Sequence, residues 1–272
     1  YGPEGPDSGK PAFALTGEAR SGALWWAGPD DNVPYQLGIA DQAAGTLLAY
    51  GILGAVVARE RYGFGQKVDV SHLGSMVWTR GMQNGISLLT NREFQRQDPR
   101  SAANSLWNCY ECSDGNWLAF SMGQADRYWP AFCKALDRLE LVEDERFNTM
   151  YARSKNPEEI NDLLAGVFKT RTRDEWEGRL VQAGDLIFER VQRTLDLADD
   201  PQVTANDYVI DFDHPTIGPS KWLQTPVTFT RTPVSTRKMA PAQGENTEQV
   251  LMDVLDYTWD DIAQLQDHGA IL

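Results

Sequence analysis

The sequence has few of the residues that mark several common classes of protein. Its 272 residues include only three cysteines and three histidines, and no G-x-S-x-G motif is present. Small secreted domains rely on several pairs of cysteines, and many serine hydrolases place their nucleophile in G-x-S-x-G. The sequence therefore implies no disulfide framework and gives no support to a hydrolytic triad.

Two of the cysteines, Cys109 and Cys112, stand in "CYEC", the spacing of half a zinc site or of a redox pair. A structural zinc site needs about four ligands, and the sequence has no second cysteine pair or close histidine pair. A redox pair belongs at a helix start after a strand, whereas "NCYECSDGNWLAFSM" predicts two strands joined by a turn. We predict packing roles for these residues and for Cys133, and no metal site.

Phosphate-binding loops are also missing. The chain has neither G-x-x-x-x-G-K-[ST] nor a G-x-G-x-x-G that follows a strand. "YGFGQK" contains G-x-G, but the pattern around it predicts a preceding helix and a following strand, the wrong order for a dinucleotide site. We interpret it as a turn.

Positive charge and long apolar runs are scarce as well. The net charge of −14 argues against nucleic acid or an anionic membrane surface as a partner. No stretch approaches the roughly 18 uninterrupted apolar residues of a membrane span; residues 43–58 come nearest. The start, "YGPEGPDSGKP", has no signal-peptide pattern. These features predict a cytoplasmic protein.

Hydrophobic residues make up 42% of the chain, which is enough for a sizeable core and two lobes. Apolar periodicity predicts a helix over 13–28 and another from near Asp41 to Tyr62, with Gly63 at its stop. A short strand at 68–70, a helix after residue 72 and a hairpin after residue 108 follow. The remainder predicts a helical region, in which one helix begins at Pro130 and another runs from Thr172 to a stop at Gly184. Proline-punctuated strands and two C-terminal helices follow. The fold class is mixed α/β.

Asp41 has two interpretations. Aspartate is a favoured helix cap because it accepts hydrogen bonds from the first free N–H groups. The same helix start keeps a carboxylate ionised, and an ionised carboxylate can act as a nucleophile. The small residues Ala43, Ala44 and Gly45 behind it would let a bulky substrate approach the backbone. Both interpretations predict aspartate at this position.

Four segments in order resemble one family. They are "YGPEGPDSGKPAF", "GIADQAAGTLLAYGILGAVVARERYGFGQKVDVS", "YECSDGNWLAFSM" and the closing "HPTIGP" with "GENTEQVL". The chain is similar to the family III coenzyme A transferases of the CaiB/BaiF type, which include formyl-CoA and carnitine CoA-transferases. The resemblance implies a two-lobed fold: a partial Rossmann-like large domain and a smaller α+β domain. It assigns 1–105 to the large domain, 106–220 to the small domain and 221–272 to a return to the large domain.

The resemblance also implies a reaction. The family's nucleophilic aspartate falls on Asp41, which would form an aspartyl anhydride and then an aspartyl-CoA thioester. Backbone N–H groups from Gln42 to Ala44 would steady the oxyanion, and Ala12 and His72 align with residues that contact CoA. His72 has a second interpretation, as a histidine that packs at a strand end. CoA thioester would be substrate, with no tightly bound cofactor and no metal. The substrate and CoA contacts expected from the resemblance are Ala12, His72, Gln42 and Ala43.

Three alternatives follow from the same resemblance. The catalytic histidine of the related racemases would fall on Phe13 and its paired acid on Ala14, which favours transfer over racemisation. Isomerisation or CoA migration on the same fold would also keep Asp41. The family's nucleotide-binding region precedes the part matched here, so a non-catalytic partner subunit of a heteromer is the third alternative. Otherwise an interlocked homodimer is expected.

The resemblance leaves two binding features open. The basic residues Arg59, Arg61 and Lys67 either contact CoA phosphates or solvate a helix end. The glycine-rich loop of some transferases would lie near 98–108, where this sequence has no glycine.

Overall fold

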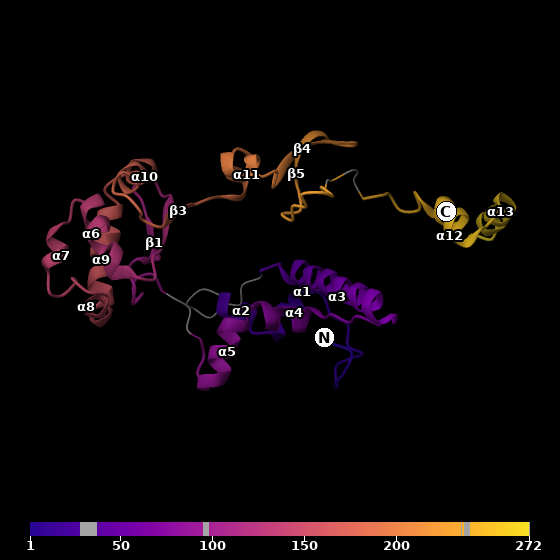
Figure 1. Cartoon of the computed structure of the whole chain (residues 1–272), viewed down its shortest axis with the longest axis horizontal. Helices are drawn as coiled ribbons and strands as arrows, with labels where there is room; N and C mark the ends of the chain where they lie inside the picture. The colour runs from indigo at the N-terminus through magenta and orange to yellow at the C-terminus, as the bar shows by residue number, and fades with distance from the viewer. Residues whose placement is uncertain (28–36, 95–97, 235, 237–239, 272) are drawn as a thin grey trace. The chain divides into compact units, whose positions relative to one another are not determined.

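The computed structural model describes residues 1–27, 37–94, 98–234, 236 and 240–271 (Figure 1). The chain divides into two compact units, Tyr1–Glu189 and Arg190–Leu272. The expected division at residues 105 and 220 stays a prediction.

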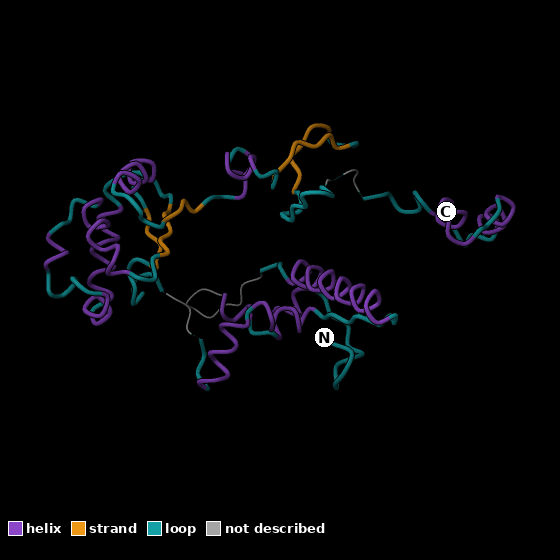
Figure 2. The backbone as a smooth tube through the Cα atoms, viewed as in Figure 1, coloured by secondary structure: helices purple, strands orange, loops and turns teal. Residues whose placement is uncertain are grey.

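Up to residue 90, the described part of the chain has helices joined by loops (Figure 2). The helix expected over 13–28 is divided at Ser21 and Gly22, because the chain turns there with a positive φ of 79° at Gly22; Gly28 lies outside the described residues. The helix expected after residue 72 is divided at Arg80. α1 packs against α2, α3 and α4. The helices are α1 (Ala14–Arg20), α2 (Ala23–Ala27), α3 (Ala40–Tyr62), α4 (His72–Thr79) and α5 (Gly81–Thr90).

α3 is one continuous helix of 23 residues and ends where the sequence predicted. Gly63 takes the left-handed conformation, with φ 78°, and its N–H donates to the Arg59 carbonyl at 2.8 Å. The helix is long and apolar enough, by length and composition alone, to cross a membrane, and 6% of its apolar 18-residue window is buried within the described structure. This corrects the expectation that no segment comes near that limit.

The strand expected at 68–70 does not form. Residues 64–71 are extended, but among the residues that the structure describes no strand pairs with them. A strand needs a neighbour to satisfy its backbone groups, so alternating valines alone were insufficient. The segment leads directly into α4.

The predicted hairpin is present as β1 (Trp107–Glu111) and β2 (Trp117–Ser121), antiparallel, with Cys109 opposite Ala119. β3 (Phe188–Val191) joins on the other side of β2. Phe120, Phe132 and Phe168 meet in the core between the sheet and its helices. These helices are α6 (Ala125–Ala135), α7 (Glu140–Glu143), α8 (Met150–Lys155), α9 (Pro157–Phe168) and α10 (Arg173–Gln182).

Pro130 lies inside α6, which corrects the expectation that the helix begins there. The helix continues because Trp129, Phe132 and Cys133 from its apolar face are fully buried, and packing outweighs the lost backbone bond.

Burial raises the pKa of the Cys133 thiol to about 12. Within the described residues no three His, Cys, Asp or Glu side chains gather as metal ligands. The expected packing role agrees with the burial of Cys112 and Cys133 in the core, whereas Cys109 is half-buried.

The second unit contains the 3-10 helix η1 (Thr194–Ala198), α11 (Pro201–Ala205) and an antiparallel hairpin. The hairpin strands are β4 (Val209–His214) and β5 (Gly218–Leu223), and Gly218 turns between them with φ 75°. The two predicted C-terminal helices are α12 (Thr247–Leu255) and α13 (Trp259–Asp267).

Candidate active site

Asp41 is the second residue of α3 and does not cap it. The N-cap position is Ile39, which has no side-chain cap bond, and the helix begins at Ala40. The Asp41 side chain is 69% exposed. An aspartate that served as the cap would fold back on the first free N–H groups, so the capping interpretation does not account for this residue.

The cap of α3 comes from another helix. The Glu18 carboxylate of α1 accepts hydrogen bonds from the N–H groups of Ile39 at 2.8 Å, Ala40 at 3.2 Å and Leu37 at 3.2 Å. Glu18 and Ala40 are both fully buried. A distant, buried carboxylate therefore satisfies the donors at the start of the helix, and the Asp41 carboxylate is left free of that task.

The charge state of Glu18 follows from the same contacts. Burial raises the pKa of its carboxyl, but hydrogen bonds from the N–H groups of four residues outweigh burial, and the net shift is downward. Glu18 is thus held as an anion at the positive end of the α3 dipole. The four donors are Ile39, Gly38, Ala40 and Leu37.

His72 is the first residue of α4, and it contacts Asp41. Its Nε2 lies 2.9 Å from Asp41 Oδ1, and the imidazole is 30% exposed. A carboxylate only accepts hydrogen bonds, so Nε2 must carry the proton. In the described part of the chain no partner lies on Asp41 Oδ2, which leaves one carboxylate oxygen held and the other open to a reactant.

Small residues bring α1 against this histidine. A Cβ added at Gly17 would lie 2.6 Å from His72 Cβ and 3.1 Å from its carbonyl carbon, which only glycine avoids. Ser71 caps α4 by accepting a hydrogen bond from the Gly74 N–H at 3.0 Å. Consecutive residues of α1, Gly17 and Glu18, therefore contact both segments that carry the pair.

Of the backbone N–H groups expected to bind the oxyanion, from Gln42 to Ala44, the structure leaves fewer available. The Ala43 N–H donates to the Ile39 carbonyl at 3.0 Å, and from Ala44 onward the N–H groups belong to the helix ladder. Among the described residues, no acceptor lies on the N–H of Gln42, which is one of the four amides a helix start leaves unbonded. Ala43 is half-buried and packs against the cluster of Ala23, Ala40 and Met76, and its N–H is not available to an oxyanion.

The remaining expected positions lie around α1. Ala12 is half-buried directly ahead of the helix, and its contact with CoA stays a prediction. Phe13 is 78% exposed at the helix start. In the basic cluster, Arg59 pairs with Glu60 at 3.0 Å and Lys67 with Asp69 at 3.0 Å.

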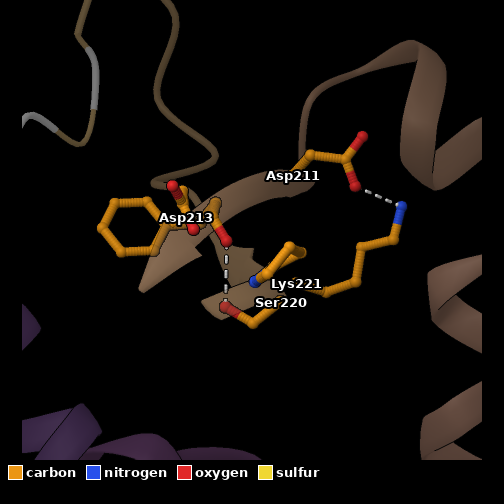
Figure 3. A pocket seen from close by; sticks show the side chains of 6 residues that line it. Asp211, Asp213, Ser220 and Lys221 are labelled. Atoms are coloured by element: carbon orange, nitrogen blue, oxygen red, sulfur yellow. Dashed lines mark hydrogen bonds and ion pairs between the residues drawn. The ribbon is translucent and has the colours of Figure 1, made fainter. Parts of the chain in front are cut away.

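Two hollows that include neither Asp41 nor His72 lie elsewhere on the described surface. A groove of about 340 Å³ on α3 is mostly apolar, lined by Leu48, Ile52, Val56 and Val68 among others. A shallow depression of about 480 Å³ lies on the β4–β5 hairpin (Figure 3). There Lys221 pairs with Asp211 across the strands at 2.7 Å. The ammonium group of Lys221 is therefore paired with a carboxylate of the same hairpin.

Sequence reasoning missed Glu18 and Gly17. Both stand in "LTGEARSG", where glycine and serine flank the acid at helical spacing. Small residues on a helix face indicate close packing, and an acid between them must then find buried partners. That signal was available, although the identity of the partners was not.

Comparisons with known proteins identify the family of the chain. The family model of CoA-transferase family III matches residues 1–247. All of the chain aligns with (R)-2-hydroxy-4-methylpentanoate CoA-transferase of Clostridioides difficile, at 29% identity over 68% of that protein. It aligns equally with cinnamoyl-CoA:phenyllactate CoA-transferase of Clostridium sporogenes, at 30% identity over 67% of that protein. The chain thus spans about two thirds of these relatives.

Solved structures show the same fold. A CaiB/BaiF family protein from Brucella suis superposes with a TM-score of 0.78 at 23% identity, over 92% of this chain and 65% of that one. The structure of Rv3272 from Mycobacterium tuberculosis gives a TM-score of 0.75 at 23% identity, over 91% and 66%. The α/β fold expected from the resemblance is confirmed, and the chain belongs to CoA-transferase family III.

Proposed function

We propose that the protein is a CoA-transferase that moves CoA from an acyl-CoA thioester to a carboxylic acid, with Asp41 as nucleophile. One observation carries the proposal: Glu18 caps α3 in place of Asp41, whose carboxylate is 69% exposed. A helix start normally engages an aspartate in capping. Here the anion is free to react.

The chemistry proceeds in balanced covalent steps. Asp41 Oδ2 attacks the thioester carbonyl carbon, the carbon–sulfur bond breaks, and CoA leaves as thiolate to give a mixed anhydride. The thiolate attacks Cγ of Asp41 and releases the donor acid, which leaves an aspartyl-CoA thioester. The acceptor carboxylate attacks Cγ and expels the thiolate, which then attacks the acceptor's acyl carbon and frees Asp41. Such division into steps is the advantage of a covalent nucleophile.

The surrounding residues support these steps. The unbonded Gln42 N–H is a donor for an oxyanion, and the half-buried Ala43 leaves room for the thioester beside the backbone. We assign Ala12 and His72 to the CoA side of the site. Arg59 and Lys67, already paired with acids, contribute less to the CoA phosphates.

Assembly and location belong to the same proposal. We propose a homodimer or a heteromer with a related chain, in the cytoplasm, with no nucleic-acid or membrane partner and no tightly bound cofactor. Light scattering of the purified protein gives its mass in solution. A stable monomer that turns over would contradict the assembly, though not the chemistry.

The test is intact-mass spectrometry of the purified full-length protein after mixing with succinyl-CoA or cinnamoyl-CoA, donors that appear in relatives' names. We expect an acyl or CoA adduct that maps to Asp41, is trapped by hydroxylamine, and is lost in Asp41→Ala. Asp260→Ala is the matched control, because Asp260 is the exposed second residue of α13. An adduct that survives Asp41→Ala, or turnover without any adduct, refutes the assignment.

A further inference from the structure

The contact between Asp41 and His72 distinguishes the two oxygens of the carboxylate. His72 Nε2 lies 2.9 Å from Oδ1, and Oδ2 has no partner among the described residues. The two oxygens of a free carboxylate are equivalent, so this hydrogen bond selects which of them is available to attack.

The histidine is itself held in place. It begins α4 directly after the Ser71 cap, whose Oγ accepts from the Gly74 N–H. Behind it lies Gly17, too close for any side chain at that position. A donor fixed by backbone packing on one side and a helix cap on the other needs little reorganisation during a reaction.

We propose that His72 is the positioning residue of the transfer reaction and donates a hydrogen bond to Asp41 Oδ1 throughout it. The inference rests on the proposed function. It assigns Oδ2 as the atom that attacks the acyl-CoA and Oδ1 as the atom that remains on Asp41 in every intermediate.

The consequence appears in the second step. Once Oδ2 is acylated, Oδ1 is the carbonyl oxygen of the aspartyl half of the anhydride. CoA thiolate that attacks Cγ places negative charge on Oδ1, and the His72 Nε2–H faces that charge. Collapse breaks the Cγ–Oδ2 bond, so the donor acid departs with Oδ2. The hydrogen bond from His72 Nε2–H therefore stabilises attack of the CoA thiolate on Cγ. This attack competes with return of the thiolate to the acyl carbon of the donor acid, so the hydrogen bond favours transfer.

The experiment compares His72→Leu, which removes the donor, with His72→Gln, whose amide N–H can replace it. His268→Leu is the matched control, because His268 is the exposed C-cap of α13 and its Nδ1 lies 2.7 Å from the Gln264 carbonyl oxygen, away from Asp41 in the sequence. Steady-state turnover and the ratio of CoA adduct to acyl adduct on Asp41 are measured with succinyl-CoA and cinnamoyl-CoA.

We expect His72→Leu to lower kcat by about 10²–10³-fold, the usual effect of losing one oxyanion donor, in addition to any rise in KM from a lost contact with CoA. The acyl adduct should accumulate over the CoA adduct, and His72→Gln should restore most of both quantities. An unchanged adduct ratio in His72→Leu, or equal losses in the Leu and Gln variants, would overturn the role. Absence of any adduct in the unaltered protein would instead overturn the proposed function, and this inference with it.

Discussion

Glu18→Gln should weaken the start of α3 in a pH-dependent manner. The variant keeps the shape of the side chain and can retain one acceptor oxygen, Oε1, for Ile39 and Ala40. It turns the other oxygen into an NH₂ group that faces the Leu37 N–H. One hydrogen bond is therefore lost and two change from charged to neutral acceptors.

The magnitude follows from these three bonds. A hydrogen bond to a charged group contributes about 1.5–3 kcal/mol and a neutral one about 0.5–1.5 kcal/mol. Conversion of two bonds costs about 1–1.5 kcal/mol each, and loss of the third, partly replaced by water at half-buried Leu37, adds about 1 kcal/mol. The free energy of unfolding should therefore fall by about 3–4 kcal/mol. Ala40 is fully buried, so water cannot replace the hydrogen bond of its N–H group.

The sign of the pH dependence is set by the lowered pKa of Glu18. A carboxyl whose folded pKa lies below its unfolded one stabilises the fold above the unfolded value, ordinarily 4.5 here. That contribution disappears as pH falls through the folded pKa. The difference between the unaltered protein and Glu18→Gln should therefore be full at pH 7 and shrink below pH 4.5.

Urea denaturation at several pH values measures this difference, and hydrogen exchange of peptides covering residues 37–45 locates it. Glu175→Gln is the control, because Glu175 also accepts from a helix start, in the capping box of α10, but is exposed. Its effect should be smaller and confined to α10. A Glu18→Gln deficit that is constant with pH, or unchanged exchange at 37–45, would refute the capping role.

Two further predictions concern packing. Gly17→Ala should displace His72 and reduce the rate of transfer by at least tenfold, at a cost of about 1–3 kcal/mol from overpacking. Gly54→Ala is the control, because a Cβ at Gly54 on α3 meets open space, and it should leave the rate unchanged. Equal activity of the two variants would contradict the placement of His72 by Gly17. Burial raises the pKa of the Cys133 thiol to about 12 and that of Cys112 to about 11. Both thiols should resist iodoacetamide at pH 8 in the folded protein and react with it in urea. Fast labelling of these thiols in the native protein would contradict their burial.

Local rules predicted the elements whose signals lie within one turn of the chain. Gly63 ends α3 in the left-handed conformation, and Thr172 caps α10 with Glu175 three residues on. The rules failed where long-range packing decided. Pro130 stays inside α6 because its neighbours are core residues, and the valines of 68–70 found no partner strand among the described residues.

The same distinction applies to the site. Asp41 was singled out from the sequence as a candidate nucleophile, a role that stays a proposal, because local rules could not separate a cap from a nucleophile and both require aspartate at a helix start. The contacts that favour the nucleophile span 22 residues, from Glu18 to Ala40, and 31 residues, from Asp41 to His72. The packing of α1, α3 and α4 creates them: Gly17 allows α1 to touch α4 at His72, and Glu18 accepts hydrogen bonds from the N–H groups at the start of α3. The reactivity proposed for Asp41 is therefore a property of three helices, and a substitution on α1 should alter it without touching the nucleophile.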